Sequence, residues 1–143
     1  MDYAWLIFAI LSALAAAFVA IFGKMGLQGM DTTTATTIRA AIMAVLLFGV
    51  IVFEGKLNLV GKILSNSEAF KYIALSGIAG ALSWLFYFLA LKTGKVSQVL
   101  PIDRLSVVFG LVLAVLVLGE RVNLQIAAGA VLMVVGAVLV ALG

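Results

Sequence analysis

The chain has 143 residues, of which 66% are hydrophobic and only 10% are charged, and its formal net charge is +3. A soluble domain of average composition carries about 25% charged residues, so this composition excludes an ordinary soluble fold. Cysteine and histidine are absent, which excludes disulfides and a Ser–His hydrolase and leaves few groups for a metal site. We therefore expect no enzymatic activity, no metal and no cofactor, and the absence of a basic, aromatic-rich run predicts no nucleic-acid partner.

Five apolar runs follow one another along the chain, and each is 19 to 23 residues long. A helix needs about 20 apolar residues to cross a hydrocarbon core of about 30 Å, so each run predicts one crossing. Residues 1–143 should therefore form one all-α domain that lies in the lipid bilayer of a cell membrane as a multi-pass protein. The predicted helices are residues 3–22, 32–53, 72–91, 96–118 and 124–142.

The connections contain the expected breakers and caps. Three glycines between residues 23 and 29 should end the first helix, and Asp31 should cap the second. The longest connection, residues 54–71, has its aliphatic residues on one helical face, which predicts a short segment in the membrane interface. Ser97 and Asn123 are the predicted caps of the fourth and fifth helices. Because the later connections are short, helices three to five should be antiparallel neighbours.

Charged residues inside the runs are Arg39, Asp103 and Arg104. Such residues are costly in a membrane and commonly mark a functional site. Arg39 lies roughly 5 Å from the middle of its run, so it should face the helix bundle or extend toward the headgroups at its Asp31 end. Asp103 either lines a cavity or is a first-turn acid of a helix that begins at Pro101.

Aromatic residues gather on the third run, where Trp84, Tyr87 and Phe88 lie on one helical face. They form either a substrate-binding surface or a surface that packs against lipid or other helices. Small residues recur at packing intervals on the last two helices, which predicts close helix contacts there. These candidate packing residues are Gly110, Ala114, Gly129 and Gly136.

The positive charges do not select one orientation. If the N-terminus is cytoplasmic, the inside connections hold four Lys and Arg residues, and the outside holds three, or five with Arg39 and Arg104. The positive-inside rule needs an excess on one side. The chain therefore has either a weakly biased single orientation or two orientations.

The segment from Trp84 to Arg121 resembles the EamA-type repeat of the drug/metabolite transporter superfamily. Its most specific feature is the Gly-Glu-Arg junction at residues 119–121 after a Leu/Val-rich helix, and the last helix resembles the usual ending of that repeat. The resemblance covers essentially the whole chain. Val107 stands where the family often has proline, which leaves Pro101 as the source of a kink in the fourth helix.

The resemblance implies a transporter that exports small organic metabolites by alternating access, with the site between two inverted repeats. One repeat per chain then implies an antiparallel homodimer, or a heterodimer with a second single-repeat chain. If Asp103 lines a cavity rather than starting a helix, its carboxylate would be available to couple protons and Arg104 would attract an anionic group of the substrate. The alternatives are a non-transporting assembly subunit and a proton-coupled multidrug efflux protein, although the first run lacks the acidic residue that such efflux proteins use. The candidate substrate-binding residues are Arg39, Trp84, Tyr87, Asp103 and Arg104.

Overall fold

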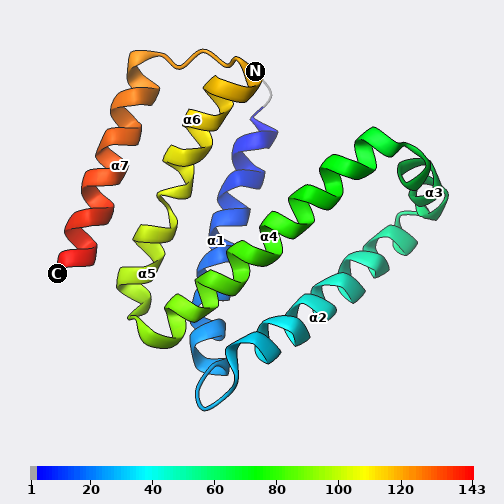
Figure 1. Cartoon of the computed structure of the whole chain (residues 1–143), viewed down its shortest axis with the longest axis horizontal. Helices are drawn as coiled ribbons and strands as arrows, with labels where there is room; N and C mark the ends of the chain where they lie inside the picture. The colour runs from blue at the N-terminus through cyan, green and yellow to red at the C-terminus, as the bar shows by residue number, and fades with distance from the viewer. Residues whose placement is uncertain (1–2) are drawn as a thin grey trace. The chain divides into compact units, whose positions relative to one another are not determined.

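A computed structural model describes residues 3–143, and this part of the chain contains helices and no strand. Five segments are long and apolar enough to cross a membrane, namely α1, α2, α4, the pair α5 and α6, and α7. The predicted all-α fold with five crossings is therefore confirmed. The helices are α1 (Ala4–Gly26), α2 (Thr32–Phe53), α3 (Leu57–Ser65), α4 (Ser67–Thr93), α5 (Val96–Asp103), α6 (Ser106–Leu118) and α7 (Leu124–Leu142) (Figure 1).

Side-chain caps fix the starts of α2 and α7. Asp31 accepts a hydrogen bond from the backbone N–H of Thr34 at 2.8 Å, and Asn123 accepts one from the N–H of Ile126 at 2.9 Å. Each bond satisfies one of the N–H groups that a helix start leaves unpaired. These two predicted caps are confirmed, and both helices begin at the predicted residue.

One predicted cap and the bounds of two predicted helices are wrong. The third helix was predicted over residues 72–91, whereas α4 spans Ser67–Thr93. Ser97 does not cap the fourth segment, because α5 already begins at Val96 and no side chain caps it. The first helix continues to Gly26, and the left-handed residue of the following turn is Gly29, with φ at 71°. A glycine costs only about 1 kcal/mol inside a helix, so Gly23 does not stop α1, which ends at Gly26.

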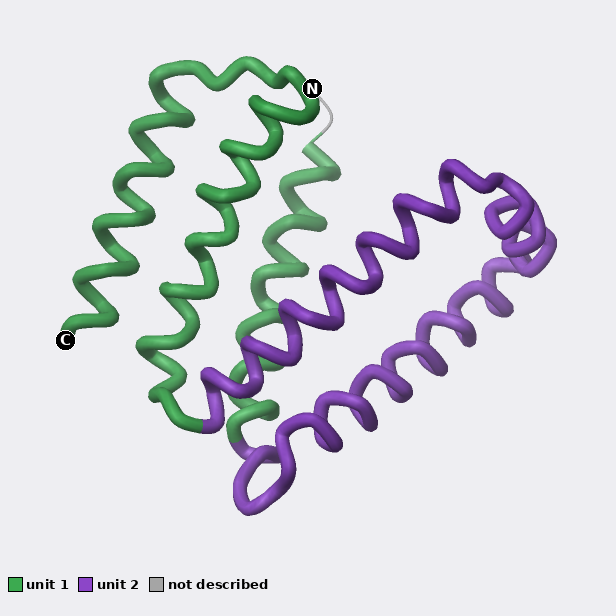
Figure 2. Tube along the Cα trace, viewed as in Figure 1, with its two compact units in different colours: residues 1–24, 93–143 green, residues 25–92 purple. Residues whose placement is uncertain are grey.

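The described chain divides into two compact units, which Figure 2 colours separately. Unit 1 comprises Met1–Lys24 and Thr93–Gly143, and unit 2 comprises Met25–Lys92. Unit 1 therefore contains most of α1 together with α5, α6 and α7, while unit 2 contains α2, α3 and α4.

In unit 1, α5 and α6 pack against α7. The side-chain amide of Gln98, near the start of α5, donates to the carbonyl of Ala141 at 3.3 Å, near the end of α7. The two helices are thus antiparallel, as predicted from the short connection. Ala137 of α7 is buried, and its small side chain suits this close approach.

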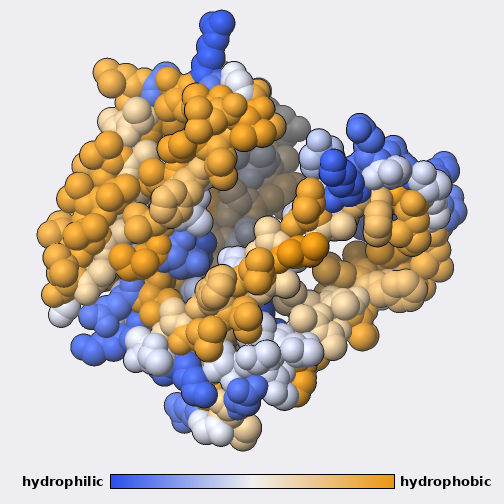
Figure 3. Space-filling model, viewed as in Figure 1, coloured by the Kyte–Doolittle hydropathy of each residue, from blue (hydrophilic) through white to orange (hydrophobic). Residues whose placement is uncertain are grey.

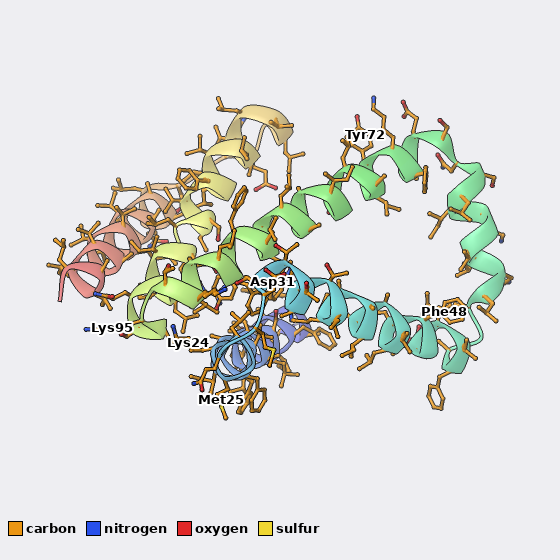
Figure 4. All side chains as sticks on the ribbon, turned by 60° about the horizontal axis from the view of Figure 1, so that its bottom comes forward. Lys24, Met25, Asp31, Phe48, Tyr72 and Lys95 are labelled. Atoms are coloured by element: carbon orange, nitrogen blue, oxygen red, sulfur yellow. The ribbon has the colours of Figure 1, made fainter. Side chains whose placement is uncertain are left out.

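In unit 2, α2 and α4 come together at one end and separate toward α3. Figure 4 shows the two helices close at Asp31 and apart where Phe48 and Tyr72 are labelled. The ammonium group of Lys92 donates to the carbonyl of Met30 at 3.2 Å and so ties the end of α4 to the turn before α2. At the other end, α3 forms the helix that the connection predicted.

Apolar side chains cover the outside of the spans, and Figure 3 shows hydrophilic residues gathered at both ends of unit 2. Few side chains of the described spans are buried, namely those of Ala20, Thr32, Phe88, Leu91 and Ala137. A fold in water hides apolar residues, whereas hydrocarbon solvates them and requires only that the backbone groups be paired, as they are in helices. The faces of these helices are therefore built to contact lipid or another protein chain.

Candidate substrate-binding site

Arg39 of α2 packs on aromatic rings of α4, and all of these residues belong to unit 2. Its guanidinium carbon lies 3.5 Å from the centroid of the Trp84 ring and 4.9 Å from that of Phe88. A cation over an aromatic face is attracted by the negative face of the ring, and arginine suits this contact because its guanidinium is weakly hydrated. Arg39 thus turns toward a neighbouring helix, which is one of the two arrangements predicted for it.

The rings themselves form a compact cluster along one face of α4. The rings of Trp84 and Phe88 are stacked, with centroids 5.7 Å apart and planes 23° apart. Tyr87 meets both of them edge-on, at 6.0 Å from Trp84 and 5.5 Å from Phe88. Residues three and four apart on a helix are neighbours, so the predicted common face is confirmed. The two stacked rings present aromatic faces to the cation from one helix.

Burial differs across this cluster. Phe88 is 2% exposed, whereas Arg39, Trp84 and Tyr87 are half-buried. The sequence singled out Trp84 and Tyr87 as candidate site residues but not Phe88, which is the anchored member of the set. The spacing of the aromatic residues places Phe88 on the same helical face as Trp84 and Tyr87. That spacing does not say which ring will contact a cation on another helix.

The charge of Arg39 is not neutralised within the described chain. No carboxylate lies within 4 Å of it, and it has no hydrogen-bond partner there. The carboxylates of unit 2 lie at the ends of its spans, and Glu54 pairs with Lys56 at 2.7 Å. An unpaired arginine near the centre of a membrane helix costs at least about 2.5 kcal/mol, so a site with this charge favours an anionic ligand.

The carboxylate of Asp31 is hydrogen-bonded to Thr34 rather than to Arg39. Besides the backbone N–H of Thr34, its carboxylate accepts the Thr34 hydroxyl at 2.7 Å. The backbone hydrogen bond from Thr34, followed by the hydroxyl bond, holds the pKa of Asp31 below its usual value, and nearby Lys92 acts in the same direction. Asp31 therefore serves the start of α2 and does not pair with Arg39.

Asp103 and Arg104 lie in unit 1, at a break in the fourth membrane segment. The expected single helix is divided, because α5 ends at Asp103 and α6 begins at Ser106. Pro101 lies inside α5 and cannot donate to the carbonyl four residues earlier. At the break the hydrogen bonds tighten to a three-residue spacing, as in the bond from Leu105 N–H to the Ile102 carbonyl at 3.0 Å.

This geometry corrects one alternative for Asp103. The helix does not begin at Pro101, so Asp103 is not a first-turn acid; it is the last residue of α5. A carboxylate at that end faces the negative end of the helix dipole, which does not stabilise it. Asp103 is half-buried and Arg104 is exposed, and neither has an ion-pair partner in the described chain. Substrate binding by these two residues remains a prediction.

The small residues of unit 1 do not bring its helices together. A Cβ atom placed on Gly110, Gly129 or Gly136 would meet no atom within 4 Å. Ala114 lies four residues after Gly110 on α6 and is half-buried. The role of these small residues in helix packing therefore remains a prediction, and it would concern contacts with another copy of the chain.

Comparison with known proteins identifies the family. The model of the EamA-like transporter family matches residues 3–142. The chain belongs to the EamA-like transporter family. It is 36% identical over 141 residues to a Sinorhizobium sp. protein named "Uncharacterized transporter in cobO 3'region", and the match covers 99% of each chain. No solved structure matches the chain. Family and helices together establish a multi-pass membrane protein of a transporter family.

Proposed function

We propose that this protein exports small organic metabolites across the cell membrane by alternating access and works as an antiparallel homodimer. The observation that carries the proposal is that one EamA-like unit of five spans fills residues 3–142. A transporter built from inverted repeats needs two such units in opposite orientations around a site near the midplane. A second copy of the chain would supply the missing half.

The distribution of positive charge supports dual insertion. The connections on the two sides of the membrane hold four and three Lys and Arg residues, so neither side has a clear excess. Insertion follows such an excess, and a chain without one can enter in both orientations. The match with the Sinorhizobium protein covers 99% of each chain.

The exposed apolar faces and the glycines that meet no neighbour in unit 1 supply a surface for the second copy. Gly110 on α6 and Gly129 and Gly136 on α7 leave room for a close backbone approach from outside the chain. Close approach is how membrane helices associate when lipid removes the hydrophobic drive. A cysteine at Gly129, crosslinked between copies, tests which helices meet.

The decisive experiment combines topology with transport. A reporter fused after Gly143 should give signal from both sides of the membrane, and purified protein in proteoliposomes should transport members of a metabolite panel, measured with and without a pH gradient. A one-sided reporter together with parallel crosslinks would contradict the antiparallel dimer. Absence of transport by correctly inserted dimers would favour an assembly subunit, and activity only with a second single-repeat chain would identify a heterodimer.

A further inference from the structure

In unit 2, Arg39, Trp84 and Phe88 form a cluster that we call the Arg39 cluster, and the N–H groups of its guanidinium donate no hydrogen bond within the described chain. The Trp84 and Phe88 rings contact the guanidinium carbon from 3.5 and 4.9 Å. Aromatic faces stabilise the charge, but they do not accept the five N–H groups of a guanidinium, which lie in its own plane. No side chain or backbone carbonyl of the described chain accepts them either. The rings therefore hold the cation while its donors remain available.

Arg39, Trp84 and Phe88 lie inside α2 and α4, away from the nearest ends of both helices. Arg39 lies seven residues inside α2, roughly 10 Å from Thr32 along the helix axis. Trp84, the closer ring, lies nine residues before the end of α4 at Thr93, roughly 13 Å along the axis. The contact with Trp84 therefore holds the cation about two helical turns or more inside the ends of the two helices.

The charge of this site matches a single carboxylate. One guanidinium binds one carboxylate through two parallel hydrogen bonds and leaves no net charge in the apolar span. Free phosphate or a phosphate monoester, with more than one negative charge at neutral pH, would leave an uncompensated charge there. The phosphodiester of a lipid carries a single charge, and the experiment with anionic lipid separates it from a carboxylate. We infer that Arg39, held by Trp84 and Phe88, is the subsite that binds the carboxylate of a small organic substrate. This inference rests on the proposed transport function and specifies its substrate class.

A binding assay tests this subsite without transport. The chain has two tryptophans, Trp5 and Trp84, so Trp5→Phe leaves Trp84 as the only indole reporter beside Arg39. The protein in nanodiscs of zwitterionic phosphatidylcholine is titrated with sodium valerate, valeramide and pentylammonium chloride, which share an alkyl chain and differ in charge. Valerate should change the Trp84 fluorescence and bind about tenfold or more tightly than the other two.

Variants assign the preference to the guanidinium. Arg39→Gln should abolish the preference for valerate over valeramide, whereas the matched control Lys71→Gln should keep it. Lys71 is exposed and its ammonium group lies 5.9 Å from the Tyr72 ring, so it is a cation beside an aromatic ring at the start of α4. Arg39→Lys keeps the charge but loses the planar fork, and it should retain only part of the preference. Equal valerate affinity in Arg39→Gln would overturn the inference, and so would a preference for pentylammonium.

A lipid phosphate is the other source of an oxyanion. In nanodiscs that contain anionic phosphatidylglycerol, valerate should bind with unchanged affinity. A spectrum of Trp84 that shifts with this lipid alone, with valerate unable to reverse it, would assign Arg39 to a headgroup and overturn the inference. The native chain could prefer valerate, lose that preference in Arg39→Gln, and yet transport no solute. In that case the proposed transport function fails, whereas the carboxylate subsite stands. If the native chain transports only uncharged solutes, and Arg39→Gln transports them equally well, the transport function stands and the carboxylate subsite fails.

Discussion

Arg39 and Arg104 are both arginines within segments that can cross a membrane, but the two units of the chain treat them differently. In unit 2, Arg39 is half-buried and its guanidinium packs on the rings of Trp84 and Phe88. In unit 1, Arg104 is exposed and follows α5 at the break before α6. One arginine is fixed by side chains on another helix, whereas the other is placed by a local interruption of its own helix.

The comparison of Arg39 with Arg104 shows that charged residues in apolar runs can occupy different structural environments. A packed cation with unused donors has the geometry of a binding site, because its position is already fixed before a ligand arrives and little entropy remains to be lost. An exposed cation at a helix break must first be ordered. The sequence offered both Arg39 and Arg104 as candidate substrate-binding residues, and of the two only Arg39 is held in place by side chains of another helix.

Replacing each arginine by leucine should give the largest difference between the two units. Arg39→Leu should reduce transport of a carboxylate substrate by roughly thirtyfold or more, because a hydrogen-bonded charge pair is lost. Arg104→Leu should reduce it by less than about threefold, since no side chain of the described chain holds the Arg104 guanidinium in a binding geometry. Initial uptake rates in proteoliposomes, normalised to inserted protein, measure both. Equal losses would mean that the packing of Arg39 has no functional consequence.

Removing the aromatic support of Arg39 should have the next largest effect. Trp84→Leu deletes the closer ring and should weaken carboxylate binding by about tenfold, since a partly desolvated cation–π contact contributes up to about 2 kcal/mol. Phe86→Leu is the matched control, because Phe86 lies on the same helix and is 65% exposed. Valerate titrations followed by calorimetry measure both variants. A similar loss in Phe86→Leu would indicate a general defect of α4.

Neutralising Asp103 should have a smaller effect. Asp103→Asn removes a carboxylate from the C-terminal end of α5, where the helix dipole opposes it, and so should raise thermal stability by an amount of order 0.5 kcal/mol. The transport rate should change by less than about threefold, with the same pH dependence. Unfolding in detergent and uptake across a pH series measure these properties. Loss of uptake together with a flattened pH profile would identify Asp103 as a proton-coupling residue.

The smallest effect concerns Asp31, which caps α2 in unit 2. Because hydrogen bonds from Thr34 lower the pKa of Asp31 in the folded protein, its contribution to stability is fully present above the unfolded-state pKa of about 4. That contribution is lost as the pH falls through the lower folded-state pKa. Asp31→Asn keeps a capping oxygen at every pH, so its melting temperature should fall less on acidification than that of the native chain. Identical acid sensitivity would show that Asp31 does not contribute to it.

The sequence by itself determined the number and type of the spans. Run length and hydropathy are local properties, so residues 32–53 and 124–142 were predicted with the bounds that α2 and α7 have. The caps Asp31 and Asn123 act over three residues, and the common face of Trp84, Tyr87 and Phe88 follows from helical spacing. The caps and the common face depend on residues within about one helical turn of each other, and each span depends on one continuous run of residues.

Only the tertiary structure decided which groups meet. The contact of Arg39 with Trp84 joins two helices far apart in the sequence, and no periodicity on α2 specifies a ring on α4. The break between α5 and α6 has a local cause in Pro101, yet its place at Arg104 and Leu105 depends on how the freed backbone groups are paired again. Helix formation is set by neighbours in the chain, whereas the partner of a buried charge is set by packing. The candidate subsite at Arg39 is a consequence of that packing.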